Sequence, residues 1–183
     1  MSRRSASVLV EPPPSEAELE TILRAATTVP DHGQLRPWRF VVVQGEARAR
    51  FGEALVQSIL QARPGSPPEA LVKARLKAFV APLFVVLVAS PRDDGKTPEW
   101  EQVTSAGLTG YAMLLAAESL GLAAGWKSSH HINGDALRQL MRLEPQEKLL
   151  GWINLGHLPQ NAVAGMAAKQ RPEVDLADVV SRL

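Results

Sequence analysis

The residues best suited to hold an anionic ligand stand at the start of the chain: Arg3, Arg4 and Ser5, with Ser7 close behind. A guanidinium group presents a planar fork of donors that matches phosphate oxygens, and a neighbouring hydroxyl adds a neutral donor. A basic N-terminal tail is otherwise a solvated end of the chain. These residues predict a phosphate site only if other ligand-binding groups gather beside them.

A polar loop between two apolar segments is a second candidate. It runs from Pro30 to Phe40 and contains His32, Gly33 and Gln34. Loops of this kind position ligand groups on a rigid scaffold. The alternative is structural, with His32 and Gln34 bonded to nearby backbone and Trp38 in the core.

A third candidate is the run Gly125–His131. Trp126 could pack on a flat ring, Lys127 could lie over an electron-rich edge of that ring, and Ser128 follows them. His130 and His131 suggest a metal, but two adjacent histidines without a nearby acidic ligand rarely make a site. We therefore predict exposed loop histidines and no metal.

The tail carries one further cation pair, Lys169 and Arg171. Their side chains point the same way in an extended segment and could close on one phosphate. A charge pair on a solvated tail is the simpler interpretation.

Composition restricts the classes of function. The chain has 183 residues, 45% hydrophobic and 21% charged, with a formal net charge of +1 and no cysteine. These values predict a single domain over residues 1–183 and exclude disulfides and cysteine nucleophiles. Near-neutral charge disfavours nucleic acid as a partner. Without an apolar run of membrane-spanning length or a signal peptide, we expect a cytoplasmic protein.

The elements that must position these residues follow from hydrophobic patterning. Ser15 and Glu18 have capping-box spacing, as do Ser66 and Glu69, and Asn133 is expected to cap a helix that runs through Met141. The run Leu83–Val88 is apolar at every position, which predicts a central strand covered on both faces. The first half of the chain is expected to contain a helix after Ser15, a strand at 40–43, a helix from about Glu46 and a second amphipathic helix with Leu71, Val72, Leu76 and Phe79. The strand at 83–88 and a long helix from 97 to 120 follow. The remaining elements are a short strand to Trp126, the helix to Met141, a strand at 149–155 and a last turn near 176–180.

That order is typical of an α+β or α/β fold. Neither G-x-G-x-x-G nor G-x-x-x-x-G-K-[ST] is present, so side chains rather than a glycine-rich loop must hold any phosphorylated cofactor. A tail of about 25 residues after His157 is long for a compact monomer and predicts a segment that wraps a second subunit, or a disordered end.

Seven segments in register resemble the FMN-dependent nitroreductase family, in particular its small single-domain bacterial branch. They are R-R-S-A-S at 3–7, the helix that ends before Pro30, Q-x-x-P-W-x-F at 34–40, W-E-Q at 100–102, A-A-E-S-L-G-L at 116–122, G-W-K-S at 125–128 and G-W-I-N-L-G-H at 151–157. The resemblance covers nearly the whole chain.

The resemblance implies an α+β fold with a mainly antiparallel sheet flanked by helices, in an intertwined homodimer that holds FMN at the subunit interface. The arm 1–14 would contact the phosphate and ribityl chain, the helix 106–120 would form the dimer core, and the extension 157–183 would wrap the partner. The implied FMN-binding residues are Arg3, Arg4, Ser5, Ser7, His32, Gln34, Trp126, Lys127, Ser128, Lys169 and Arg171.

The implied activity is hydride transfer from NADH or NADPH through flavin N5 to a nitroaromatic, quinone or similar acceptor, with ping-pong kinetics. No protein group is expected to be catalytic, and Lys127 is expected to tune the flavin electrostatically. Two alternatives stay open: a flavin dehydrogenase or oxidase that does not use nicotinamide, and a non-catalytic flavin-binding protein. The physiological acceptor and the choice between NADH and NADPH are not visible in the sequence.

Overall fold

A computed structural model of the chain describes residues 3–162 and 174–182. Its centre is a sheet in the order β1-β2-β4-β3, in which every neighbouring pair is antiparallel. The strands are β1 (Trp38–Gln44), β2 (Leu83–Ala89), β3 (Ala123–Lys127) and β4 (Lys148–Gly156). The predicted α+β class is confirmed.

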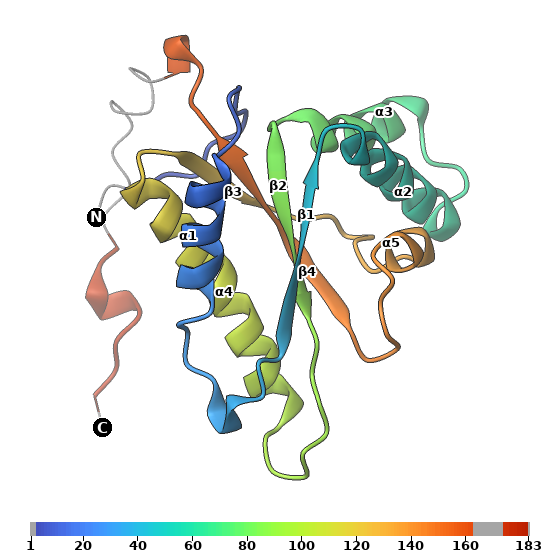
Figure 1. The fold of residues 1–183 in the computed structure, drawn as a ribbon. Helices are drawn as coiled ribbons and strands as arrows, with labels where there is room; N and C mark the ends of the chain where they lie inside the picture. The colour runs from blue at the N-terminus through green and yellow to red at the C-terminus, as the bar shows by residue number, and fades with distance from the viewer. Residues whose placement is uncertain (1–2, 163–173, 183) are drawn as a thin grey trace.

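Helices cover both faces of this sheet (Figure 1). On one side lie α1 (Glu16–Ala26) and α4 (Glu99–Ser119), and on the other lie α2 (Ala47–Ala62), α3 (Pro68–Leu76) and α5 (Asp135–Leu140). Three short 3-10 turns complete the described elements: η1 (His32–Gln34), η2 (Lys77–Phe79) and η3 (Leu176–Asp178).

The uniform apolarity of β2 follows from this layering. All seven of its residues are buried, and successive side chains enter different hydrophobic clusters. Val85 and Leu87 pack with α1 and α4, whereas Phe84 and Val86 pack with α2 and α5. Because side chains alternate along a strand, one continuous apolar run contributes to the hydrophobic cores on both faces of the sheet. The prediction of a strand covered on both faces is confirmed.

One of the predicted capping boxes forms and the other does not. At α1, Glu18 N donates to Ser15 Oγ (3.3 Å) and Ser15 N donates to Glu18 Oε2 (2.8 Å). The prediction for Ser66 was wrong, because its hydroxyl donates to the Arg63 carbonyl (2.8 Å) and α3 begins after Pro67. Ser66 closes the turn after α2 instead of capping α3.

Asn133 was also assigned the wrong role. Gly134, not Asn133, is the N-cap of α5. The Asn133 amide instead pairs with both backbone groups of Leu149, at 2.7 Å to the N–H and 3.1 Å to the carbonyl. β2 pairs with Leu149 on one side, but β3 ends opposite Trp152, so the Asn133 side chain takes the place of a strand partner for Leu149 on the β3 side.

The second amphipathic helix differs from its expected form. α3 ends at Leu76, η2 follows, and the buried positions are Ala74 and Ala78. Val72, Leu76 and Phe79 lie on the surface of the single chain. Small residues face α2 because the two helices approach closely, which leaves the larger apolar side chains outside.

A partly buried ion pair joins β1 to the turn before β4. Arg39 donates to both carboxylate oxygens of Glu147 at 2.8 Å, and Glu144 N donates to the same group at 3.0 Å. The Glu147 side chain is 3% exposed. The Arg39 guanidinium and the Glu144 N–H outweigh burial and lower the pKa of Glu147 from its ordinary 4.5 to about 2.

This depressed pKa makes part of the stability pH-dependent. The contribution is fully present above about pH 4.5 and is lost as pH falls toward 2, and it amounts to at most about 3 kcal/mol. We expect Glu147→Gln to lose more stability at pH 7 than at pH 3, measured by urea unfolding. Glu20→Gln, which removes an exposed carboxylate, serves as control. An equal loss for Glu147→Gln at both pH values would contradict this assignment.

Candidate functional site

The N-terminal arm is fixed against the edge strand β3. Ala6 N donates to the Ala124 carbonyl at 3.0 Å, and Leu9 N donates to the Val80 carbonyl at 2.8 Å. Val10 pairs with His157, which directly follows the end of β4. Gly156 in turn pairs with Ala123, so Val10 lies near the start of β3 while Ala6 lies farther along this strand, at Ala124.

Glycine at position 125 permits this contact. A Cβ there would lie 2.6 Å from the Ala6 carbonyl oxygen, closer than atoms approach. Three extended residues span at most about 10 Å, so Arg3 and Ser5 lie within that reach of Ala6, towards the C-terminal end of β3. The fold thus brings the basic start of the chain to the strand that carries Trp126 and Lys127.

The arm's polar side chains are oriented by local contacts. Arg3 donates to Ser5 Oγ and Arg4 donates to the Arg3 carbonyl, both at 3.2 Å. Ser5 and Ser7 are exposed, whereas Arg3 and Arg4 are half-buried. These groups form a polar surface on which a phosphate could accept several hydrogen bonds.

Trp126 is partly buried and packs against α4 rather than lying on this polar surface. Its ring packs at Gly110 of α4, where a Cβ would lie 2.7 Å from the ring, and its Nε1 donates to the Leu150 carbonyl at 3.3 Å. Gly151, with a φ of 133°, makes room for the indole. Trp126 therefore fixes the end of β3, and Lys127 points to the opposite face of the sheet, toward α2 and α3.

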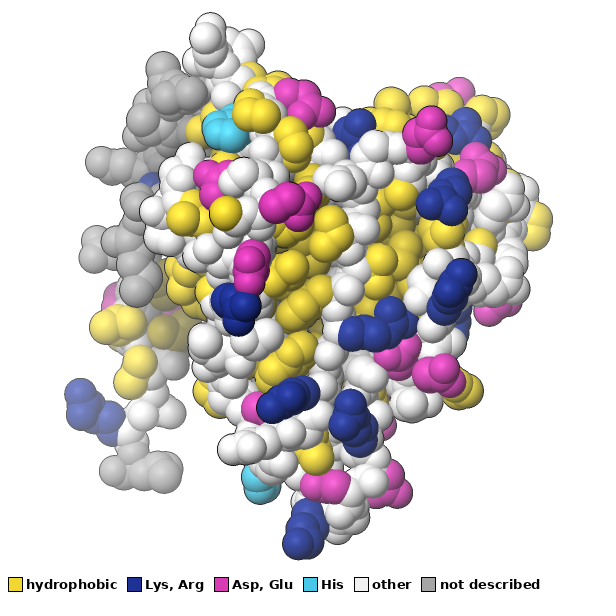
Figure 2. Space-filling model, viewed as in Figure 1, with side chains coloured by type: hydrophobic (Ala, Val, Ile, Leu, Met, Phe, Trp, Pro, Cys, Tyr) yellow, Lys and Arg dark blue, Asp and Glu magenta, His cyan; other side chains and the backbone are white. Residues whose placement is uncertain are grey.

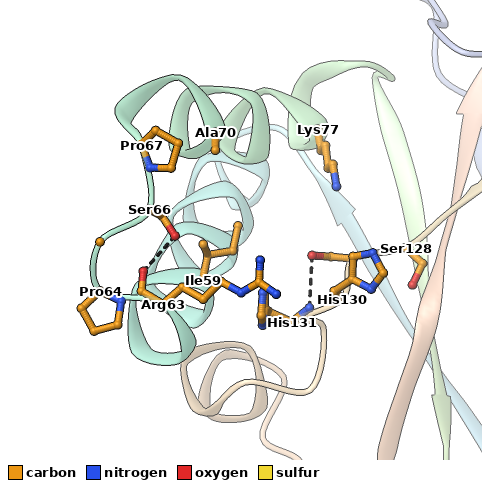
Figure 3. Close-up of a pocket in the computed structure, with 12 residues that line it drawn as sticks. Ile59, Arg63, Pro64, Ser66, Pro67, Ala70, Lys77, Ser128, His130 and His131 are labelled. Atoms are coloured by element: carbon orange, nitrogen blue, oxygen red, sulfur yellow. Dashed lines mark hydrogen bonds between the residues drawn. The ribbon is translucent and has the colours of Figure 1, made fainter.

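A cavity of about 750 Å³ opens on that face, directly after β3 (Figure 3). Ser128 lines it, as do Ser129, His130 and His131 of the β3–α5 loop. The opposite wall is α2, the turn after it, α3 and η2, which contribute Ile59, Arg63, Pro64, Gly65, Ser66, Pro67, Ala70 and Lys77. Its size is typical of a site for a small molecule or cofactor.

Sequence reasoning missed Lys77. It lines the cavity across from Ser128 and points into it, whereas Lys127 is not among the lining residues. The position is set by η2, which the Leu9–Val80 hydrogen bond ties to the arm. No local motif marks Lys77, because Ser128 and the β3–α5 loop, which face it across the cavity, lie about 50 residues away along the chain.

His32 and Gln34 lie elsewhere, on η1. His32 Nδ1 is 2.8 Å from Glu101 Oε2 near the start of α4, and hydrogen bonding to Glu101 raises the pKa of His32. His32 and Glu101 line a smaller pocket of about 230 Å³, together with Trp100 and Leu108, whereas Gln34 is not among its lining residues. This arrangement favours the imidazolium form of His32.

Within one chain, the pocket at η1 and the cavity beside β3 are well separated. Glu101 and Gly110 are nine residues apart on α4, which corresponds to about 13 Å along the helix axis. The segment that holds η1 lies at the opposite end of α4 from the arm (Figure 1). A single copy does not bring His32 and Gln34 to the cavity beside β3.

Two predicted residues are not placed. Lys169 and Arg171 lie outside the described residues. Within residues 3–162 and 174–182, no group of three or more His, Asp or Glu side chains is arranged to hold a metal ion. In the same ranges, no helix has the length and apolarity required to cross a bilayer.

Comparison with known proteins places this arrangement in a family. The model of the nitroreductase family matches residues 1–157, which include the arm, η1, β3 and the cavity. The chain belongs to the nitroreductase family. The predicted relationship to this family is thereby confirmed.

Nitroreductase relatives match over most of their length. The Escherichia coli K12 protein named "Putative NAD(P)H nitroreductase YdjA" is 40% identical over 156 residues, which cover 85% of this chain and 84% of the relative. A Haemophilus influenzae protein named "Putative NAD(P)H nitroreductase" is 33% identical with the same coverage.

Solved structures share the nitroreductase fold. A nitroreductase-like family protein from Bacillus cereus superposes with a TM-score of 0.78 at 18% identity, covering 100% of this chain and 92% of that one. The FMN-dependent nitroreductase NfnB from Mycobacterium smegmatis, solved with NADPH, gives 0.74 at 19% identity and covers 99% and 94%.

Proposed function

We propose that this nitroreductase is an FMN-dependent NAD(P)H oxidoreductase that reduces nitroaromatics, quinones or similar electron-poor acceptors. The observation that carries the proposal is the cation-lined cavity at the end of β3, beside a basic arm that Gly125 allows to lie close. Relatives named NAD(P)H nitroreductases support the donor. Structural neighbours named FMN-dependent support the cofactor.

The residues present suit FMN. The arm offers Arg3, Arg4, Ser5 and Ser7 to the phosphate and ribityl chain, and the cavity offers Ser128 and Lys77 to the ring. When bound, FMN supplies the redox chemistry by accepting hydride at N5 and passing it to the acceptor. Trp126, which packs against α4 on the other face of the sheet, would act indirectly by fixing the end of β3. Lys169 and Arg171 are proposed as further phosphate contacts.

A cation close to the flavin N1 and C2 carbonyl would stabilise the negative charge of the reduced form. The sequence suggested Lys127 for this role, and the cavity adds Lys77 as a second candidate. Replacing either with methionine keeps the aliphatic stem, so a change in the flavin reduction potential reports the lost charge.

We expect Lys77→Met to lower the reduction potential by about 30 to 60 mV, the equivalent of one charge-assisted hydrogen bond for a two-electron couple. Lys127→Met is the matched variant, and spectroelectrochemistry compares the two. The Lys77 assignment is wrong if only Lys127→Met shifts the potential, and both assignments are wrong if neither does.

The active unit is proposed to be a homodimer. α4 carries exposed apolar side chains at helical spacing, namely Trp100, Leu108, Tyr111 and Leu115. A stripe of this kind is usually covered by a partner. A second copy packed on α4 would bring its own His32 and Gln34 toward the flavin, which one chain cannot do alone.

The C-terminal extension 157–183 is proposed to wrap this partner. Val174, Leu176, Val179 and Val180 are all more than half exposed in the single chain. An apolar furrow lies open between α1 and β1 on the face seen in Figure 2, lined by Leu19, Leu23 and Phe40. β1 is an edge strand, and an edge of this kind readily accepts a further segment.

Anaerobic mixing with NADH and NADPH tests the proposed activity. The flavin absorbance of the purified protein is expected to bleach with at least one donor and to recover when a nitroaromatic or a quinone is added. Bleaching with neither donor would favour a dehydrogenase or oxidase that does not use nicotinamide. If no donor reduces the flavin and no acceptor reoxidises it, a non-catalytic flavin-binding protein would be favoured.

A further inference from the structure

The cavity beside β3 extends well past the proposed flavin position. One end is formed by Ser128, Ser129 and Lys77, directly after β3. The other end is formed by Arg63, Ser66 and Pro67, at the turn between α2 and α3. His131 lies along the wall that joins the two ends (Figure 3).

Local structure leaves the Arg63 side chain available for a ligand. Arg63 N donates to the Ile59 carbonyl at 2.7 Å, and the Arg63 carbonyl accepts from both the backbone N–H (3.1 Å) and the hydroxyl (2.8 Å) of Ser66. The backbone of the turn is therefore satisfied internally. The guanidinium extends toward the β3–α5 loop and forms no ion pair with a carboxylate of the described residues.

The electrostatics of the whole cavity favour an anion. Arg63 and Lys77 face it from one wall and two histidines from the other, and no Asp or Glu is among its lining residues. The nine-residue helix α3 begins at the Arg63 end, and its N-terminal dipole adds positive potential there. Guanidinium groups bind phosphate oxygens with matched geometry.

We propose that the Arg63 end of this cavity binds the phosphate groups of the reduced nicotinamide dinucleotide, an inference that rests on the proposed function. The nicotinamide would then stack over the flavin at the Ser128 end while its phosphates reach the α2–α3 turn. The same chemistry would suit an anionic acceptor or the phosphate of FMN itself, so the test must separate these three ligands.

Stopped-flow reduction of the flavin under anaerobic conditions distinguishes the dinucleotide, an anionic acceptor and the FMN phosphate as ligands of Arg63. The donors are NADPH and 1-benzyl-1,4-dihydronicotinamide, which is neutral and lacks phosphate. The variants are Arg63→Ala and, as a control, Arg50→Ala, which removes an exposed cation from α2 outside the cavity. We expect Arg63→Ala to raise the NADPH concentration for half-maximal rate about tenfold, with the limiting rate unchanged.

The neutral donor should react equally with wild type, Arg63→Ala and Arg50→Ala. An unchanged NADPH dependence in Arg63→Ala overturns the inference while the proposed function stands. A colourless Arg63→Ala overturns it by placing the FMN phosphate at Arg63. Slower reoxidation of Arg63→Ala by 4-nitrobenzoate but not by nitrobenzene, with NADPH unaffected, overturns it in favour of an anionic acceptor. A wild type bleached by neither donor overturns the proposed function itself.

Discussion

Replacement of Arg3 and Arg4 together by alanine is expected to yield protein that is mostly colourless after purification. Each guanidinium is proposed to donate charge-assisted hydrogen bonds to the FMN phosphate. Such bonds contribute about 1.5 to 3 kcal/mol each, so the loss of two residues corresponds to at least a hundredfold weaker FMN binding. Fluorescence titration of the apoprotein with FMN measures the effect directly.

The control for this variant is Arg24→Ala, which removes a guanidinium from an exposed pair with Glu20 on α1. It should keep its colour. Titration with riboflavin, which lacks the phosphate, should show little difference between wild type and the double variant. Yellow colour retained by Arg3→Ala/Arg4→Ala after extensive dialysis would refute the phosphate assignment.

The second large effect is expected from Leu115→Glu in the middle of the α4 stripe. Leu115 is 41% exposed in one chain, so a charge there costs little to the fold of the monomer. A charge buried twice across a two-fold interface would instead be strongly unfavourable. We expect monomers in analytical ultracentrifugation and, because His32 and Gln34 of the partner are then removed, loss of bound FMN.

Leu76→Glu provides the matched comparison. Leu76 is also an exposed leucine, at 54%, but it belongs to the apolar patch of α3 and η2 on the other side of the sheet. This variant should remain a dimer. The reverse outcome, a dimeric Leu115→Glu and a monomeric Leu76→Glu, would move the interface from α4 to α3.

The order and type of the main helices and strands were predictable because hydrophobic patterning follows burial in most of them. The apolar run of β2 lies between two helical layers, and Gly121, with a φ of 76°, ends the long helix α4 where expected. Capping was less predictable. Ser15 caps its helix, whereas Ser66 and Asn133 use the same chemistry on nearby carbonyl and strand backbone groups. Spacing in the sequence does not distinguish these local partners.

The site was predictable only where its residues are adjacent in sequence. The arm and the G-W-K-S run each form a recognisable motif, and Gly125 joins them. Lys77 and Arg63 enter the cavity from another part of the chain, through packing of η2 and of the α2–α3 turn against the β3–α5 loop. Such contacts depend on tertiary approach, which no local pattern encodes. The separation of His32 from the cavity likewise became visible only in three dimensions.

Sedimentation of the freshly purified protein, followed at a wavelength that only flavin absorbs, tests whether two chains together hold FMN. We expect one yellow species with twice the 19.8 kDa mass of a single chain and one FMN per chain. A colourless monomer that takes up no added FMN would contradict it.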